Sequence, residues 1–182
     1  MRNPVEIGEL VYLRPIELDD IDGGWLSWVN DKRVSEQLTS VFPMTREDLA
    51  RYYEDSKPPG AAMFAVCTVE DDTYIGNARL SSIDWRHRKC TYGRLIGATE
   101  YRGKGHGTEA LRLLLRYAFI RLGMNRVHTV VFAGNEASVR SNEKAGMKKE
   151  GVLRQALYHG GRYVDVVKFA MLRPEFDELY SQ

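Results

Sequence analysis

Residues 90–133 constrain the fold of this chain more than any other part of the sequence. A strand-like run, Cys90–Ile96, is followed by a glycine-rich segment, Tyr101–Thr108, and then by the helical run Glu109–Leu122. The apolar residues of that run recur at the spacing of one helix face, which predicts a helix packed on a core. Val127–Ala133 is a further apolar run. This order predicts two parallel strands joined by a right-handed crossover through the helix.

The remaining segments predict an antiparallel meander before this unit and a hairpin after it. Two helices are expected early in the chain, from Asp19-Asp20 to about Val29 and from Thr45 to about Lys57. Asn135 is expected to cap a short helix that ends at Gly146. The other predicted strands are 11–15, 63–69, 74–83, 148–158 and 162–171. We expect one domain, 1–182, of the α/β (α+β) class. Its sheet should be mixed and mostly antiparallel, with six to seven strands, splayed central parallel strands and helices on both faces.

Composition excludes several classes of function. Lys plus Arg number 26 and Asp plus Glu 25, which disfavours non-specific binding to nucleic acid. No apolar window is long enough to span a membrane, and the first residues lack the apolar segment of a signal peptide. The two cysteines, Cys67 and Cys90, do not make a disulfide framework, and no cluster has the spacing of metal ligands. We therefore expect a cytoplasmic protein without a metal.

The glycine-rich segment predicts an anion site. Gly103, Gly105 and Gly107 lie between a strand and a helix, where backbone N–H groups converge on the positive end of the helix. The spacing matches neither the P-loop nor the dinucleotide fingerprint, so a flexible turn is the alternative. Residues 86–104 hold six basic residues against one acid, which favours a phosphorylated ligand. Residues 17–57 hold ten acids against five bases, which favours a cationic acceptor unless those charges are only solvated surface.

The pattern Arg102-x-x-Gly105-x-Gly107 resembles the acetyl-CoA pyrophosphate loop of the GCN5-related N-acetyltransferase (GNAT) family. Asn135-Glu136-Ala137-Ser138 and the later Glu143–Met147 resemble a second motif of that family. The ending Glu150–Arg154, with Tyr158, Gly161-Arg162-Tyr163 and Asp165, is similar to the branch of ribosomal-protein alanine, spermidine and amino-sugar acetyltransferases. The resemblance covers residues 10–172.

The resemblance implies roles for named residues, with acetyl-CoA as co-substrate. The pantetheine arm would lie where the central strands splay, at Leu95, Ile96 and Gly97, and Asn135 would contact it from the opposite side. The backbone N–H of Ile96 or Gly97 would stabilise the oxyanion. The pyrophosphate would be held by Arg102, Gly103, Lys104, Gly105, His106, Gly107 and Thr108.

The chain departs from the family at Asn142, where many members have a tyrosine that protonates the leaving thiolate. An amide cannot give up a proton, but it can donate a hydrogen bond to the cofactor sulfur. Ser138, Ser141, Tyr158 or water are candidate proton sources. Asp84 and Glu100 are candidate bases, with an ordinary surface carboxylate as the alternative reading for each.

The resemblance implies an acetyl-CoA-dependent N-acetyltransferase that acts on a primary amine by direct attack in a ternary complex. The acceptor could be a protein N-terminus, a polyamine or another small amine. Two alternatives remain open: an amino-sugar nucleotide as acceptor, and a non-catalytic acyl-CoA-binding module. The oligomeric state is also open, with a homodimer as one alternative.

Overall fold

Eight strands form one sheet in the computed structural model, which describes residues 1–38 and 42–180. Their order across the sheet is β1-β2-β3-β4-β5-β6-β8-β7. Every neighbouring pair is antiparallel except β5 and β6, which are parallel. The mixed sheet and its central parallel pair are therefore as predicted. The strands are β1 (Glu6–Ile7), β2 (Val11–Pro15), β3 (Ala62–Thr68), β4 (Tyr74–Asp84), β5 (Lys89–Ile96), β6 (Arg126–Phe132), β7 (Lys148–His159) and β8 (Arg162–Leu172).

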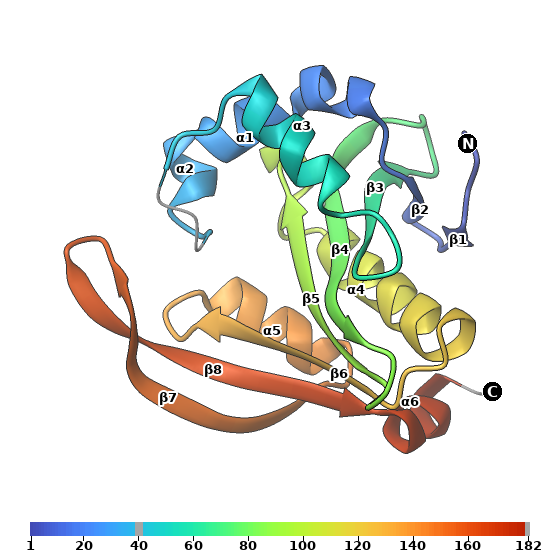
Figure 1. The fold of residues 1–182 in the computed structure, drawn as a ribbon, viewed down its shortest axis with the longest axis vertical. Coiled ribbons are helices and arrows are strands. Elements are labelled where there is room, and N and C mark those ends of the chain that lie inside the picture. Colours follow the sequence, from blue (N-terminus) through green and yellow to red (C-terminus); the bar gives the residue numbers. More distant parts are fainter. Residues whose placement is uncertain (39–41, 181–182) are drawn as a thin grey trace.

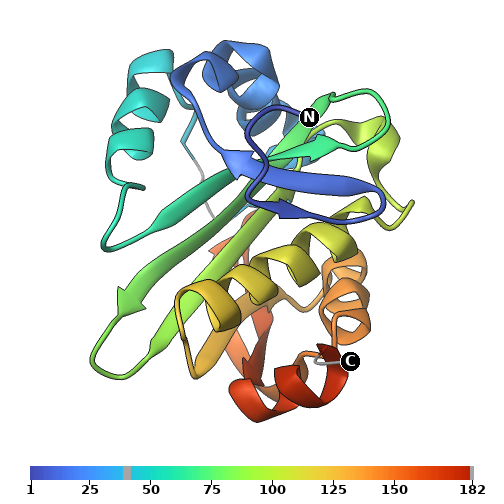
Figure 2. The ribbon, with the colours of Figure 1, turned by 90° about the vertical axis from the view of Figure 1, so that its right-hand side faces the viewer.

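Helices cover both faces of the sheet, as predicted (Figures 1 and 2). Strand β3 shows why, because its side chains alternate between two apolar clusters. Phe64 and Val66 pack in the cluster that contains the leucines of α4, whereas Met63 and Ala65 pack with Trp25 on the other face. The helices are α1 (Leu26–Asn30), α2 (Lys32–Ser35), α3 (Arg46–Glu54), α4 (His106–Arg116), α5 (Glu136–Lys144) and α6 (Arg173–Tyr180).

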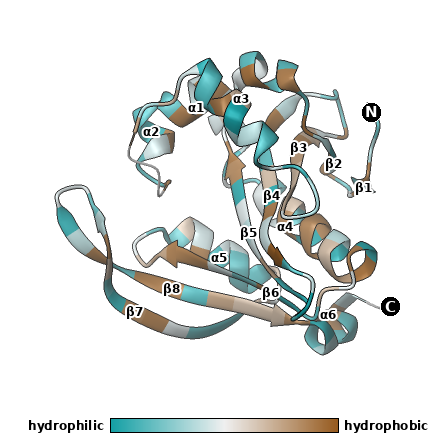
Figure 3. Cartoon of the chain, viewed as in Figure 1, coloured by the Kyte–Doolittle hydropathy of each residue, from teal (hydrophilic) through white to brown (hydrophobic). Residues whose placement is uncertain are grey.

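The long helix after the glycine segment anchors the larger cluster. Leu111, Leu114, Leu115 and Phe119 are fully buried, which confirms the predicted apolar stripe. Figure 3 shows the contrast between the apolar residues of the sheet and the mostly hydrophilic α3. Among the described residues, none of the helices combines the length and apolar character needed to cross a membrane.

Strands β5 and β6 pair only at their beginnings. Lys89 lies opposite Arg126, Cys90 opposite Val127 and Thr91 opposite His128, and beyond this point the strands diverge (Figure 1). Strand β5 runs toward α1, whereas β6 stays paired with β8. The predicted splay is confirmed, and the sheet is split by a gap that starts after Thr91.

Strand β1 and helices α2 and α6 were absent from the sequence prediction, and β1 raises the number of strands in the described sheet to eight. Strand β1 has two residues, too few to show an alternating pattern, and it pairs with Leu13 and Tyr12 of β2. Helix α6 follows β8 directly and buries Phe176 against Phe119, with ring centroids 4.9 Å apart.

The first predicted helix is wrong as a continuous element. The segment is a 3₁₀ turn (Leu18–Asp20), a π turn (Ile21–Trp25) and then α1, because Gly24 adopts a φ of 138° inside it. Asp20 does not cap this helix as predicted. It is buried and forms a two-pronged ion pair with Arg14, at 2.6 and 2.8 Å. The capping box predicted for the second helix is confirmed at Thr45.

Candidate active site

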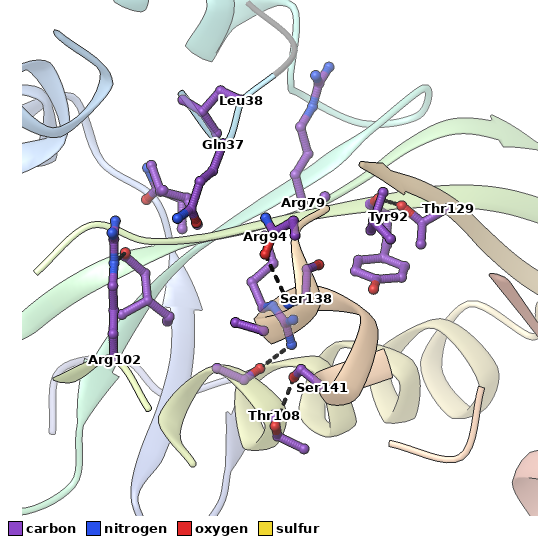
Figure 4. A pocket seen from close by; sticks show the side chains of 18 of the residues that line it. Gln37, Leu38, Arg79, Tyr92, Arg94, Arg102, Thr108, Thr129, Ser138 and Ser141 are labelled. Carbon is purple, nitrogen blue, oxygen red and sulfur yellow. Dashed lines mark hydrogen bonds between the residues drawn. The ribbon is translucent and has the colours of Figure 1, made fainter. Parts of the chain in front are cut away.

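One cavity of about 1330 Å³ joins the glycine segment, the gap between β5 and β6, and the underside of α1–α3. Figure 4 shows that its two sides differ. Arg94 points toward Thr108 and Ser141, whereas Arg79 points the opposite way, on the side of Gln37 and Leu38. We call these the cofactor half and the acceptor half. The cofactor half contains Arg94, Ile96, Arg102, Gly103, Gly105, Gly107, Thr108, Asn135, Ser138 and Ser141; the acceptor half contains Trp25, Val29, Gln37, Leu38, Tyr52, Met63, Asn77, Arg79 and Gly93.

Backbone conformation shapes the glycine segment into a cradle of backbone N–H groups. Gly103 and Gly105 have positive φ values of 74° and 96°, which side-chain-bearing residues rarely adopt. Gly105 caps α4 without a side-chain hydrogen bond, so the first N–H groups of the helix remain open to a ligand. The carboxylate of Glu109 fixes this end of α4, because it accepts hydrogen bonds from the backbone N–H groups of Glu9, Leu10 and Val11 at 2.7–3.0 Å.

Most of the predicted pyrophosphate residues line the cofactor half. Arg102 is one of them, and its Nε donates to the carbonyl of Ile96 at 2.8 Å, which ties the loop to the end of β5. Two lie differently from the rest. Lys104 is exposed, and His106 packs edge-on against Tyr101, with ring centroids 5.2 Å apart.

The end of β5 offers one candidate for the oxyanion site rather than two. The N–H of Gly97 already donates to the carbonyl of Ile75 at 2.9 Å. Alternate residues of a strand direct their backbone groups to the same neighbour, so Arg94 and Ile96 direct theirs toward the gap. Leu95 and Ile96 line the cavity, whereas Gly97 lies under Trp28, whose ring leaves no room for a side chain.

Arg94 places a positive charge at the junction of loop and gap. Its Nη1 donates to the carbonyl of Gly107, and within the described part of the chain it has no carboxylate partner. Burial lowers the pKa of Arg94, but guanidinium groups stay charged in proteins even when their pKa falls. The sequence prediction counted Arg94 only as local charge. The position of this charge depends on which side of β5 carries the Arg94 side chain, and a cluster of basic residues in the sequence does not indicate that side.

Asn142 is buried behind the cavity wall. Its Oδ1 accepts a hydrogen bond from the phenol of Tyr92, and its Nδ2 donates to the carbonyl of Ser138 at 2.8 Å. Burial raises the pKa of Tyr92, which keeps the phenol protonated as the donor. Asn142 therefore joins α5 to β5. Asn135 lines the cavity and caps α5 as predicted, accepting from the N–H of Ser138 at 3.1 Å.

The structure does not bring three other predicted residues to this cavity. Asp84 pairs with Lys89 at the closed end of the β4–β5 hairpin, whereas Ile96 lies at the opposite end of that strand pair. Tyr158 is 63% exposed near the tip of the β7–β8 hairpin, and Glu100 is exposed. Each lies in a turn or hairpin whose position along the strands could not be derived from sequence.

His128 is a cavity residue that the sequence prediction missed. It stands at the apex of the gap, opposite Thr91, and its Nδ1 is buried without a hydrogen-bond partner in the described part of the chain. Burial lowers the pKa of His128, and the cations Arg126, Lys168 and Lys89 lower it further, against a small opposing effect of Glu150. In sequence it looks like any residue inside an apolar strand.

The fold is that of an N-acetyltransferase. It superposes on a spermidine N-acetyltransferase from Vibrio cholerae, solved in complex with CoA and spermine, with a TM-score of 0.85 over 93% of this chain and 99% of the other, at 23% sequence identity.

Sequence comparison gives the family. The family described as acetyltransferase (GNAT) domain matches residues 11–148. A putative ribosomal N-acetyltransferase of Bacillus subtilis, YdaF, is 37% identical over 85% of this chain and 80% of its own length. A prophage-derived uncharacterized N-acetyltransferase of the same organism, YokL, is 29% identical over 93% and 94%. The chain belongs to the GNAT acetyltransferase family, as its motifs indicated.

Proposed function

We propose that the chain transfers the acetyl group of acetyl-CoA to a primary amine bound in the acceptor half of the cavity. The observation that carries the proposal is the continuity of one cavity from the glycine cradle, through the gap, to the space under α1–α3. A long thioester can span the first two parts, while an amine reaches the acyl carbon from the third.

The residues present fit acetyl-CoA, which supplies an activated acyl group when bound. The N–H groups of the cradle, with Arg102, suit the pyrophosphate. The unpaired backbone groups of β5 beyond Thr91 suit an extended amide-containing arm that lies like an added strand. The N–H of Ile96 would polarise the thioester carbonyl and stabilise the oxyanion that forms during attack.

Direct attack by the amine is favoured over an acyl-cysteine intermediate. Cys67 and Cys90 are 1% and 0% exposed. Burial raises the pKa of both thiols, that of Cys90 to about 12, so neither forms a thiolate near neutral pH. The amine nitrogen would attack the carbonyl carbon, the C–S bond would break, and the nitrogen would lose a proton.

His128 is our candidate for the proton acceptor. A lowered pKa keeps its imidazole neutral, and therefore able to accept a proton, at neutral and mildly acidic pH. The ammonium form of an acceptor amine must lose a proton before attack, and a neutral base in the cavity would assist that step. The thiolate of CoA can leave without a general acid, because free thiols titrate near pH ~8.5.

Release of free thiol tests the proposal directly. The protein is mixed with acetyl-CoA and a panel of primary amines, and thiol is measured against controls without amine. Amine-dependent thiol release, together with the N-acetylated product by mass spectrometry, is the expected result. Tight binding of acetyl-CoA without turnover of any amine would instead favour a non-catalytic acyl-CoA-binding module.

A further inference from the structure

We infer that the acceptor amine also carries an anionic group, a carboxylate or a phosphate, that binds to Arg79 in the acceptor half. This inference rests on the proposed function and narrows its acceptor to one chemical class. Among the described residues that line the acceptor half, Arg79 is the charged one.

Arg79 is held with part of its hydrogen-bonding capacity unused. Its Nη1 donates to the phenol oxygen of Tyr52 at 2.6 Å, and its guanidinium carbon lies 4.5 Å from the centre of the Tyr52 ring. Its Nε is buried and has no partner within the described residues, nor does the side chain form an ion pair there. The Nη2 group of Arg79 also has no acceptor among the described residues and is not buried, so a carboxylate or phosphate in the cavity can reach it and pair with the guanidinium.

The surroundings leave space for such a ligand. Arg79 lies opposite Gly93 on β5, and a side chain built at Gly93 would meet nothing within 4 Å. Its other neighbours on this face are uncharged, with Met63 on β3 and Trp25 packed near Tyr52. A poorly hydrated apolar floor strengthens the attraction between a guanidinium and an anion.

Several residues of segment 17–57 line the cavity, but among the described lining residues none is one of the acids of that segment, so its negative charge does not support a cationic acceptor. Its acids mostly form ion pairs elsewhere, such as Asp22 with Arg46 at 3.0 Å and Asp31 with Arg33 at 2.7 Å. In the described lining the acids are Glu9 and Glu109, both beside the glycine cradle, and Glu109 already accepts three backbone hydrogen bonds. The acceptor half therefore offers no carboxylate to a polyamine.

The other arginines of the lining lie outside the acceptor half and do not explain Arg79. Arg112 donates to the carbonyl of Lys144 at 2.9 Å on α5, and Arg140 pairs with Glu136 at 2.8 Å. Arg112 belongs to α4 and Arg140 to α5, the helices that also supply Thr108, Ser138 and Ser141 to the cofactor half. Arg79 points away from that region (Figure 4), so its anion must come from the acceptor.

Matched acceptors that differ only in the anion test this inference. Thiol release is compared for glucosamine against glucosamine 6-phosphate, and for glycylglycinamide against glycylglycine, with spermidine as the cationic arm. We expect kcat/KM to be roughly ten- to hundred-fold higher for at least one anionic member than for its neutral twin. The two pairs distinguish phosphate from carboxylate recognition.

Three variants locate the effect. R79Q should abolish the preference, R79K should restore part of it, and the surface control R46Q should leave it intact. Three outcomes would each overturn the inference while leaving the proposed transfer intact. They are equal kcat/KM values for the acceptors with and without the anion, a preference for spermidine, and a preference for the anion that is unchanged in R79Q.

A binding measurement keeps the inference testable if no amine is acetylated. Calorimetry on the CoA complex compares glucosamine 6-phosphate and glycylglycine with their neutral twins. Binding of an anionic member that is lost in R79Q, at an unchanged melting temperature, supports anion recognition by Arg79. Absence of that difference overturns it. Failure of turnover with intact anion binding therefore counts against the proposed function alone.

Discussion

The two halves of the cavity are built from different kinds of atoms. The cofactor half presents mainly backbone groups: N–H groups of the α4 cradle and unpaired groups of β5, fixed by glycines and by the carboxylate of Glu109. The acceptor half presents side chains from several separate elements, among them Tyr52 of α3, Arg79 of β4 and Trp25 before α1. A binding site made of backbone groups requires particular backbone conformations along one short segment. A binding site made of side chains requires only that residues far apart in the sequence lie close together in the fold.

This difference explains why two proteins can share one half and not the other. A cradle of backbone N–H groups recognises any ligand with a phosphate in the right place, so its glycines serve every acceptor alike. Replacement of a few side chains in the other half changes which amine is bound without disturbing the cradle. Variants in one half should therefore affect one substrate only, and the variants below test that separation.

The largest effect is expected at Gly105. G105V forces a branched side chain onto a residue with a φ of 96° and brings a Cβ within 3.3 Å of Leu10 Cδ1. The cradle must distort, and loss of two or more N–H contacts to phosphate should weaken acetyl-CoA binding by about a hundred-fold or more. Calorimetry measures the affinity, with G151A as the control because that position is open. Unchanged affinity in folded G105V would refute the cradle.

The second prediction tests whether His128, which lies between the cofactor half and the acceptor half, accepts the proton of the amine. If it accepts the proton from the amine, H128Q should lower kcat by about a hundred-fold with little change in the KM for acetyl-CoA. The wild-type acid limb should lie below pH ~6.5, because the pKa of His128 is lowered, and this limb should be absent in H128Q. Steady-state kinetics against pH measures both, with the exposed His87 replaced in H87Q as control. A normal kcat in H128Q would indicate that water, not His128, accepts the proton of the amine.

Replacement of Asn142 should distinguish a role in stability from a role in catalysis. N142A leaves the buried phenol of Tyr92 without its acceptor, which should cost about 1–3 kcal/mol of unfolding free energy while the folded fraction keeps kcat within a few-fold. Denaturant unfolding and initial rates measure the two quantities, and N125A is the exposed control. A normal stability with kcat reduced about ten- to hundred-fold would restore the hydrogen bond to sulfur predicted from sequence.

The smallest effect is a pH dependence of stability. The pKa of His128 is lower in the folded protein than in the unfolded chain, so the unfolded chain binds more protons as pH falls. Its contribution to stability is complete above pH ~6.5 and is lost as the pH falls toward the folded-state value. Between pH 7.5 and 5, H128Q should therefore lose less thermal stability than the wild type. Parallel melting curves of the two proteins would exclude the lowered pKa.

The cofactor half could be predicted from sequence because its determinants are contiguous. The strand, three glycines and apolar helix lie within residues 90–133, and Asn135 follows directly. Arg79, Tyr52 and His128 carry no such pattern, since their proximity depends on strand register and on a helix with an irregular first half. Asp84 was misplaced for the same reason: the strand before it, 74–83, was predicted, but the end of the sheet at which this residue lies was not.

The early separation of β5 from β6 has a consequence for self-association. Two strand edges with unsatisfied backbone groups ordinarily invite pairing with other protein molecules, and proteins protect such edges with lysines, prolines or bulges. Here the edges open into a cavity whose walls include residues of α1, α3, α4 and α5. A strand of another molecule could pair with these edges only by entering between those helices. The walls that shape the ligand channel thus also keep these edges from nucleating aggregates.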